Sequence, residues 1–225
     1  MKKNNIYIAA ILGIGLLFTS CKKYLDINED PNRVTTVKPE LLFNYALVTY
    51  GTNRSGGDFY VPLILAVQTE SDGGSYGWAQ GNAYDIGTYS LGNTWTTLYV
   101  NGGQNLKLAA QISESSTPAN PAAAAQCKIL LAQEMYDCTM LFGDIPYSEA
   151  WQATTIPYPK FDSQQDVLNS LLKLLDEAIA QIPASGGNPI EAADLAYKGD
   201  LGKWKRAAYA MKLRILMAMI DKDPS

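Results

Sequence analysis

Apolar side chains recur at helical spacing through the second half of the chain. In residues 163–182 they share one face: Val167, Leu168, Leu171, Leu172, Leu175, Ala178, Ile179 and Ile182. Residues 201–219 repeat the pattern with Trp204, Ala207, Ala208, Met211, Ile215, Ala218 and Met219. This period predicts amphipathic helices that each bury one face. The first of these helices is preceded by Ser163, which forms a capping-box pattern with Asp166. The second is preceded by Asp200, a typical N-cap residue.

Four more helices are predicted upstream, at residues 39–50, 59–70, 95–113 and 122–141. The first has Leu41, Leu42, Tyr45, Ala46 and Val48 at helical spacing and is followed by a turn at 53–57. In the last, Ile129, Leu130, Met135 and Met140 can face a core. Gly102 and Gly103 lie inside 95–113 and mark a weak point or a close approach.

The later helices pair as hairpins, 95–113 with 122–141 and 163–182 with 201–219. No segment has a convincing strand pattern. We therefore expect an all-α fold of tetratricopeptide-like helical hairpins with long aromatic, glycine-rich loops.

Two segments interrupt the helical pattern. Residues 71–93 contain six glycines and four aromatic side chains, with no helical or strand period. The second segment, 142–161, is rich in Pro and Tyr and contains Trp151. Loops this long are uncommon in compact domains and are often functional.

The N-terminus has the three parts of a secretion signal. Lys2 and Lys3 precede thirteen mostly apolar residues, 6–18, and small residues then lead to Cys21. A membrane span would need about 20 apolar residues. A cysteine directly after the cleavage site is the mark of a lipoprotein, and acyl chains on it would hold the protein on a membrane. We therefore predict a signal peptide at 1–20, lipidation of Cys21 and a polar tether at 21–36.

Composition excludes several functions. After removal of residues 1–20, which include Lys2 and Lys3, the remaining 205 residues carry 16 basic and 22 acidic side chains, a net charge of −6. No nucleic-acid partner is therefore expected. The chain has no histidine, which excludes Ser-His and Cys-His catalysis and His-ligated zinc. No cofactor or metal is expected. Cys127 and Cys138 lie in one predicted helix, about 16 Å apart, too far for a disulfide.

The segment Phe142-Gly143-Asp144-Ile145-Pro146-Tyr147 directly follows a predicted helix. Gly143 suits the left-handed position that ends helices, Asp144 can accept hydrogen bonds from nearby backbone amides, and Pro146 stops the helix. We interpret the segment as a fixed structural turn rather than a ligand contact.

Several short motifs, in this order, resemble the SusD/RagB-like outer-membrane lipoproteins of Bacteroidetes. They are the lipidated Cys21 with Tyr24-Leu25-Asp26, Asp30-Pro31-Asn32, Trp95 with Leu98, Tyr99 and Asn105, the turn at 142–147, Asp194-Leu195-Ala196-Tyr197, and Gly199-Asp200 with Lys203-Trp204. The resemblance runs from Cys21 to the end of the chain.

The resemblance implies an α-helical, tetratricopeptide-like protein that is not an enzyme. It would capture glycans at the outer membrane and act as a lid on a SusC-like TonB-dependent transporter. Family members are about twice as long, so we expect residues 37–225 to be the N-terminal part of the helical domain, with the C-terminal half absent. Family members on the cell surface often have acidic residues directly after the lipid cysteine, whereas this chain has Lys22 and Lys23 there. The expectation that the protein faces the cell surface therefore rests on the resemblance alone.

The loop at 71–93 has the chemistry of a sugar site. Sugars need aromatic faces beside amides and carboxylates. Our ligand-binding candidates are Trp78, Tyr76, Tyr84, Tyr89, Asp72, Gln80 and Asn82. The competing interpretation is that these aromatics only pin the loop onto the helices.

Two other functions stay open. One is a peptide-binding lid of the same transporter type, because helical hairpins often hold extended peptides. A secreted glycoside hydrolase would need two carboxylates facing a cleft, and Asp72 with Asp85 is the available pair.

Overall fold

The computed structural model describes residues 37–56 and 92–220. Its helices are α2 (Pro39–Gly56), α5 (Gly92–Thr96), the π-helix η3 (Thr97–Gln104), α6 (Asn105–Ser115), α7 (Pro121–Phe142), α8 (Gln164–Gln181) and α9 (Leu201–Met219). The described ranges contain no strand beyond an isolated bridge between Ile145 and Asp162. The predicted all-α class is confirmed. The predicted signal, tether and helix at 59–70 lie outside the described residues.

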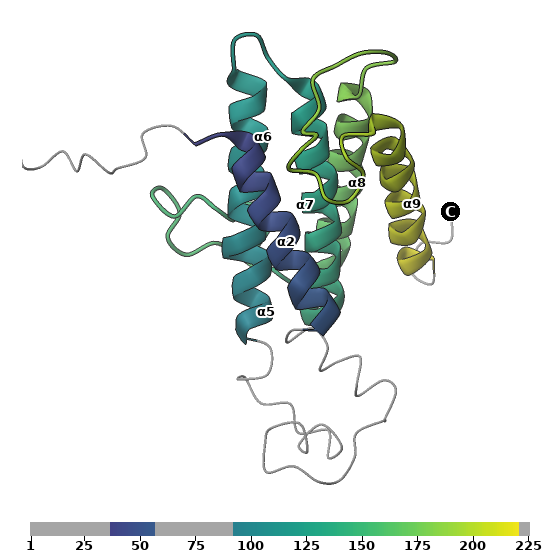
Figure 1. Ribbon diagram of the computed structural model, residues 1–225. Coiled ribbons are helices and arrows are strands. Elements are labelled where there is room, and N and C mark those ends of the chain that lie inside the picture. Colours follow the sequence, from purple (N-terminus) through teal and green to yellow (C-terminus); the bar gives the residue numbers. More distant parts are fainter. Residues whose placement is uncertain (1–36, 57–91, 221–225) are drawn as a thin grey trace, which may run out of the picture. The chain divides into compact units, whose positions relative to one another are not determined.

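Helix α7 is the centre of the fold. It contacts α2, η3, α6, α8 and α9, and in Figure 1 it lies between α6 and α8. Asn120 caps it by accepting a hydrogen bond from the Ala123 amide, and Pro121 occupies its first turn. Its side chains are buried on almost every side, including both Cys127 and Cys138, which are free thiols as predicted. A helix that is buried all round has to be surrounded by partners.

The predicted hairpins are present. Helix α6 packs against α7, and α8 packs against both α7 and α9, which gives the tetratricopeptide-like layer (Figure 1). The caps of α8 and α9 are also those predicted: Ser163 accepts the Asp166 amide at 3.1 Å, and Asp200 accepts the Lys203 amide at 2.9 Å. Trp204 follows as a buried anchor in the first turn of α9.

Asp194 joins the segment before α9 to the centre of the fold. Its fully buried carboxylate accepts hydrogen bonds from five donors. These are the backbone amides of Ala196, Tyr197 and Gly199, the Trp204 indole at 2.7 Å and the Gln126 amide at 3.3 Å. Because Gln126 belongs to α7 and Trp204 to α9, one carboxylate fixes the two helices relative to each other.

Helix α2 differs from the prediction. We expected a turn at 53–57, but the helix continues to Gly56, so residues 53–56 are helical. The buried face is also different: Phe43, Ala46 and Tyr50 are buried, whereas Leu41, Tyr45 and Val48 are exposed. Apolar residues occur on all sides of this helix, so periodicity alone could not select the face. Packing selects it, because Phe43 meets the Trp204 ring edge-on at 5.9 Å.

Smaller corrections concern helix ends and single side chains. Met140 is 47% exposed and Ala218 is also exposed, although both were expected in the core. Both lie near the end of a helix, beyond the neighbours that cover the preceding turns. The predicted loop at 71–93 ends early, because Gly92 and Asn93 already belong to α5. In the described parts of the chain, no helix is long and apolar enough to cross a membrane.

The predicted helix at 95–113 is longer and contains a π-helical segment. Its two glycines are a close approach, as expected. A Cβ on Gly102 would lie 1.7 Å from the Glu134 carboxylate, and a Cβ on Gly103 would lie 2.2 Å from the Trp151 ring. Both distances are far below van der Waals contact. Glycine is therefore required at both positions for α7 and the loop after it to pack here.

We predict that Gly103→Ala destabilises the protein by about 1–3 kcal/mol, because the new methyl group displaces the Trp151 ring. Gly51→Ala is the matched control: it also lies in a helix, but nothing is within 4 Å of its Cβ position. It should leave stability unchanged or raise it by about 0.5–1 kcal/mol. Urea unfolding followed by circular dichroism measures both, and a Gly103→Ala protein as stable as the wild type would contradict the packing.

Candidate ligand site

The ligand residues predicted from the sequence are not described by the structure. Trp78, Tyr76, Tyr84, Tyr89, Asp72, Gln80 and Asn82 all lie outside the described residues, as do Cys21 and Asp85. They remain predictions. The described part of the chain instead presents a pocket beside the turn that follows α7.

That turn is a structural element, as expected from its sequence. Gly143 has a φ of 75° and a ψ of −121°, so the backbone leaves the helix in a positive-φ conformation other than the left-handed helical one. Thr139 donates its hydroxyl to the Gly143 carbonyl at 2.7 Å. Asp144 does not bond to nearby amides; it accepts the Gln164 amide, at the start of α8, at 2.9 Å. The turn therefore connects α7 to α8.

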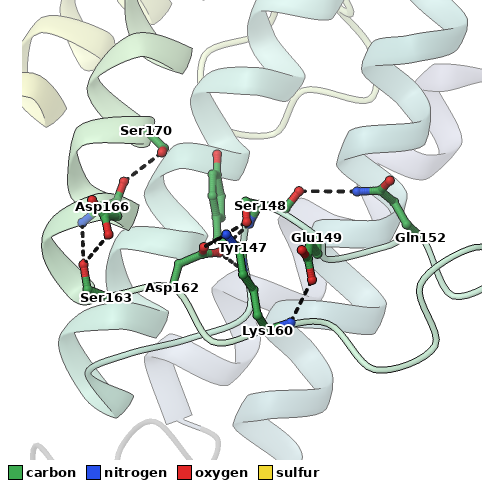
Figure 2. Close-up of polar contacts among 9 residues, drawn as sticks. All are labelled: Tyr147, Ser148, Glu149, Gln152, Lys160, Asp162, Ser163, Asp166 and Ser170. Carbon is green, nitrogen blue, oxygen red and sulfur yellow. Dashed lines mark hydrogen bonds and ion pairs between the residues drawn. The ribbon is translucent and has the colours of Figure 1, made fainter.

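Asp162 holds the second half of the turn. Its carboxylate accepts the amides of Tyr147 and Ser148, at 3.1 and 2.7 Å, and the Ser148 hydroxyl at 2.8 Å (Figure 2). Lys160 lies 3.5 Å from it. Partial burial opposes ionisation of Asp162, but the hydrogen bonds from Ser148 and Tyr147 and the charge of Lys160 outweigh it and lower the pKa. The ionised carboxylate thereby orders Tyr147 and Ser148.

Aromatic rings fill the space between this turn and η3. Tyr99 stacks on Trp95 at 4.4 Å and lies 5.8 Å from Trp151, which meets Tyr147 edge-on at 6.3 Å. Tyr99 also donates its hydroxyl to the Pro146 carbonyl at 2.7 Å. The Trp151 indole donates to the Tyr99 carbonyl at 2.8 Å. Together these contacts fix the orientation of the Trp151 ring.

The backbone of Trp151 is strained. Its φ is 61°, in the left-handed region that bulky residues seldom adopt. Strain of this kind persists only where surrounding contacts over-determine it, and it is concentrated at functional sites. Here the indole hydrogen bond and the space at Gly103 supply those contacts.

Tyr147 and Trp151 form one wall of a pocket of about 370 Å³. Helices α6, α7 and α8 supply the rest. Its polar lining residues are Lys107, Gln111, Glu114, Lys128 and Ser148, and its apolar ones are Ala110, Leu131 and Leu174. A concave apolar surface with a few polar groups is the usual form of a small-molecule site.

Glu134 is a second unusual feature near this region. Its carboxyl group is fully buried against Gly102, and neither oxygen has a hydrogen-bond partner among the described residues. Burial, and next the charge of Asp137, raise its pKa well above the ordinary value of 4.5. Burial therefore favours the neutral form of Glu134 over the ionised form. No group of residues in the described ranges could hold a metal ion.

The fold is an α-helical, tetratricopeptide-like scaffold with a pocket lined by α6, α7, α8 and the loop after α7. Residues 31–225 match the SusD-like family described as starch-binding and associating with the outer membrane. Because this match covers most of the chain, the protein belongs to the SusD-like family, as its motifs indicated. Comparison with curated protein sequences gives no match.

Solved structures agree with the family. A chitin-binding protein is 30% identical over 83% of this chain and 40% of its own length, with a TM-score of 0.69. A SusD/RagB family protein from Bacteroides thetaiotaomicron is 21% identical over 84% and 40%, with a TM-score of 0.68. A SusD homolog from Bacteroides fragilis is 25% identical over 82% and 36%, with a TM-score of 0.59. The chain thus spans about 40% of the length of the first two structures.

Sequence reasoning did not find the pocket. Trp151 was visible as an aromatic residue in a proline-rich loop, and Gly102-Gly103 as a close approach. Nothing in the sequence linked the two. Lys107 lies in the predicted helix at 95–113 with no pattern that marks it, and only tertiary packing brings it to Trp151.

We predict that Asp162→Asn lowers the unfolding free energy by about 1–3 kcal/mol at pH 7, because the charge-assisted bonds to Tyr147 and Ser148 weaken. Since the folded-state pKa is lowered, this stabilisation is present above the ordinary value of 3.8 and is lost as the pH falls through the folded-state pKa. Unfolding curves at several pH values measure the difference.

The control for that series is Asp176→Asn. Asp176 is exposed and pairs only with Lys212 among the residues described, so its loss should cost less than about 0.5 kcal/mol. An Asp162→Asn deficit that stays constant down to pH 2 would contradict the assigned role of the carboxylate.

Proposed function

We propose that this protein captures oligo- or polysaccharides at the outer membrane and delivers them to a SusC-like TonB-dependent transporter. The observation that supports it most is the 30% identity to a chitin-binding protein across most of this chain, within a family described as starch-binding. Chitin oligosaccharides are accordingly the first ligands to test. The protein acts by binding, and its helices serve as a scaffold.

The loop at 71–93 is the proposed glycan surface. Its aromatic residues offer flat apolar faces for the C–H side of sugar rings. Asp72, Gln80 and Asn82 offer hydrogen-bond partners for the hydroxyl rim. Trp78 is the first candidate, because Gly77 and Ala79 on either side leave its ring with few local covers.

The lipid on Cys21 is the proposed anchor. Lipidation with acyl chains such as palmitate would hold the protein on the outer membrane, with the polar residues 21–36 as a tether. We propose that it faces the cell surface, where a lid over an import channel has to sit.

We predict that Trp78→Ala weakens glycan binding at least tenfold, since loss of one stacking face costs about 1.4 kcal/mol. Tyr158→Ala is the matched control, because Tyr158 is 91% exposed and lies in the other loop. Calorimetry with chitin oligosaccharides, and pull-down on a panel of insoluble polysaccharides, measure the effect.

Full retention of polysaccharide by the Trp78→Ala protein would reject this loop as the binding surface. Binding of peptides in place of every glycan would favour the peptide-lid alternative. Release of reducing sugar during incubation would support the hydrolase alternative.

We predict that Cys21→Ala moves the protein from the membrane fraction to the soluble fraction, because the acyl chains are its proposed anchor. Cys127→Ala, which changes a fully buried thiol, should leave fractionation unchanged. Detergent extraction of the wild-type protein through an affinity tag should also recover a large β-barrel transporter. Purification that never yields such a partner would contradict the lid role while leaving glycan binding intact.

A further inference from the structure

The pocket beside Trp151 contains a cation, Lys107, that has no counter-charge among the described residues. Lys107 lies at its exposed rim, with the ammonium 5.3 Å from the centre of the Trp151 ring and 3.5 Å from the Ala150 carbonyl. No carboxylate in the described parts of the chain forms an ion pair with it. Partial desolvation against the indole lowers its pKa. An ammonium in this position is stabilised by an anion brought from outside.

The other lysine of the pocket is already neutralised. Lys128 lies 2.8 Å from Glu114 and 3.2 Å from Glu177. The pocket therefore has a positive end at Lys107 and an acidic end at Glu114. The two residues are seven positions apart on α6, on one face of the helix and about 10 Å from each other along its axis.

Groups that can bind hydroxyls lie along this axis. Gln111, between Lys107 and Glu114 on the same helical face, has an exposed amide with no hydrogen-bond partner in the described ranges. The Tyr147 hydroxyl also has no hydrogen-bond partner in the described ranges. Burial, and next the charge of Glu177, raise its pKa to about 12. The Tyr147 hydroxyl is thus a neutral donor and acceptor. Glu114 can accept hydrogen bonds from hydroxyl groups at the far end.

We propose that this pocket binds a carboxylate-bearing sugar, a uronic acid unit at the end of an oligosaccharide. Its carboxylate pairs with Lys107, its C–H face packs against the wall of Tyr147 and Trp151, and its hydroxyls bond to Gln111 and Glu114. The site uses none of the residues of the loop at 71–93.

The wall is preorganised for such a ligand. Trp151 is fixed by the hydrogen bond that its indole donates to the Tyr99 carbonyl and by the space at Gly103. Tyr147 is fixed by the hydrogen bond that its backbone amide donates to the Asp162 carboxylate. Little side-chain ordering is left for the binding step, which reduces its entropic cost. A charge-assisted bond to Lys107 then adds selectivity for the acid over the neutral sugar.

The test compares digalacturonate with galactobiose, its uncharged counterpart, and with acetate, an anion without a ring. Titration of the full chain is followed by calorimetry and by the indole resonance of Trp151, assigned with Trp151→Phe. We expect digalacturonate to bind at least about tenfold more tightly than galactobiose and acetate to bind more weakly still. Lys107→Met should lose that tenfold preference and keep the helicity of the wild type.

Two controls separate this site from other effects. Lys205→Met removes one charge from α9 and should leave digalacturonate binding unchanged. Chitin oligosaccharides, which carry no carboxylate, test the proposed glycan loop separately, so this proposal and the proposed glycan loop can fail independently. Equal binding of digalacturonate and galactobiose, acetate binding as tight as digalacturonate, an unaffected Lys107→Met protein, or no binding of digalacturonate at millimolar concentration would each overturn the proposal.

Discussion

The close approach at Gly102 and Gly103 is the constraint on which the described structure depends. Two adjacent positions without side chains admit the Glu134 carboxyl of α7 and the Trp151 ring of the following loop. The backbone adopts a π-helix here, and the Tyr99 carbonyl bonds to the Trp151 indole. Single-turn π-helices occur often at functional sites because they change which groups a helix presents. In this protein the change places an aromatic wall beside α6.

The buried acids of this fold are stabilised in three different ways. Asp194 remains an acceptor for five donors and ties α7 to α9. Asp137 accepts from Tyr50 and pairs with Arg54, which joins α7 to α2. Glu134 has no such partners among the described residues, and burial raises its pKa. Ionisation of Glu134 opposes folding as the pH rises from 4.5 towards its raised pKa.

The sequence was sufficient where local chemistry decides the structure. The caps at Ser163 and Asp200 and the single apolar faces of α8 and α9 are local features, and each was predicted. Helix α2 was misread because Leu41 and Phe43 are equally apolar, and only the contact of Phe43 with Trp204 decides between them. The pocket was not predictable for the same reason. Lys107 is 40 or more positions from Tyr147 and Trp151, and those two residues lie in a loop without a hydrophobic period. Only packing brings the three together.

A captor that serves a transporter has to release its ligand, and the chemistry of the Lys107 pocket suits that requirement. A single charge pair at a solvent-exposed rim is screened by salt and contributes modestly. The apolar wall is rigid but covers only one side of a sugar ring. A weak site of this kind adds to the retention of a long polysaccharide when another site on the same protein holds the same chain, because the second contact is intramolecular. The loop at 71–93 is the proposed other site. Two weak contacts that dissociate one at a time retain a polymer and still let it pass to the channel.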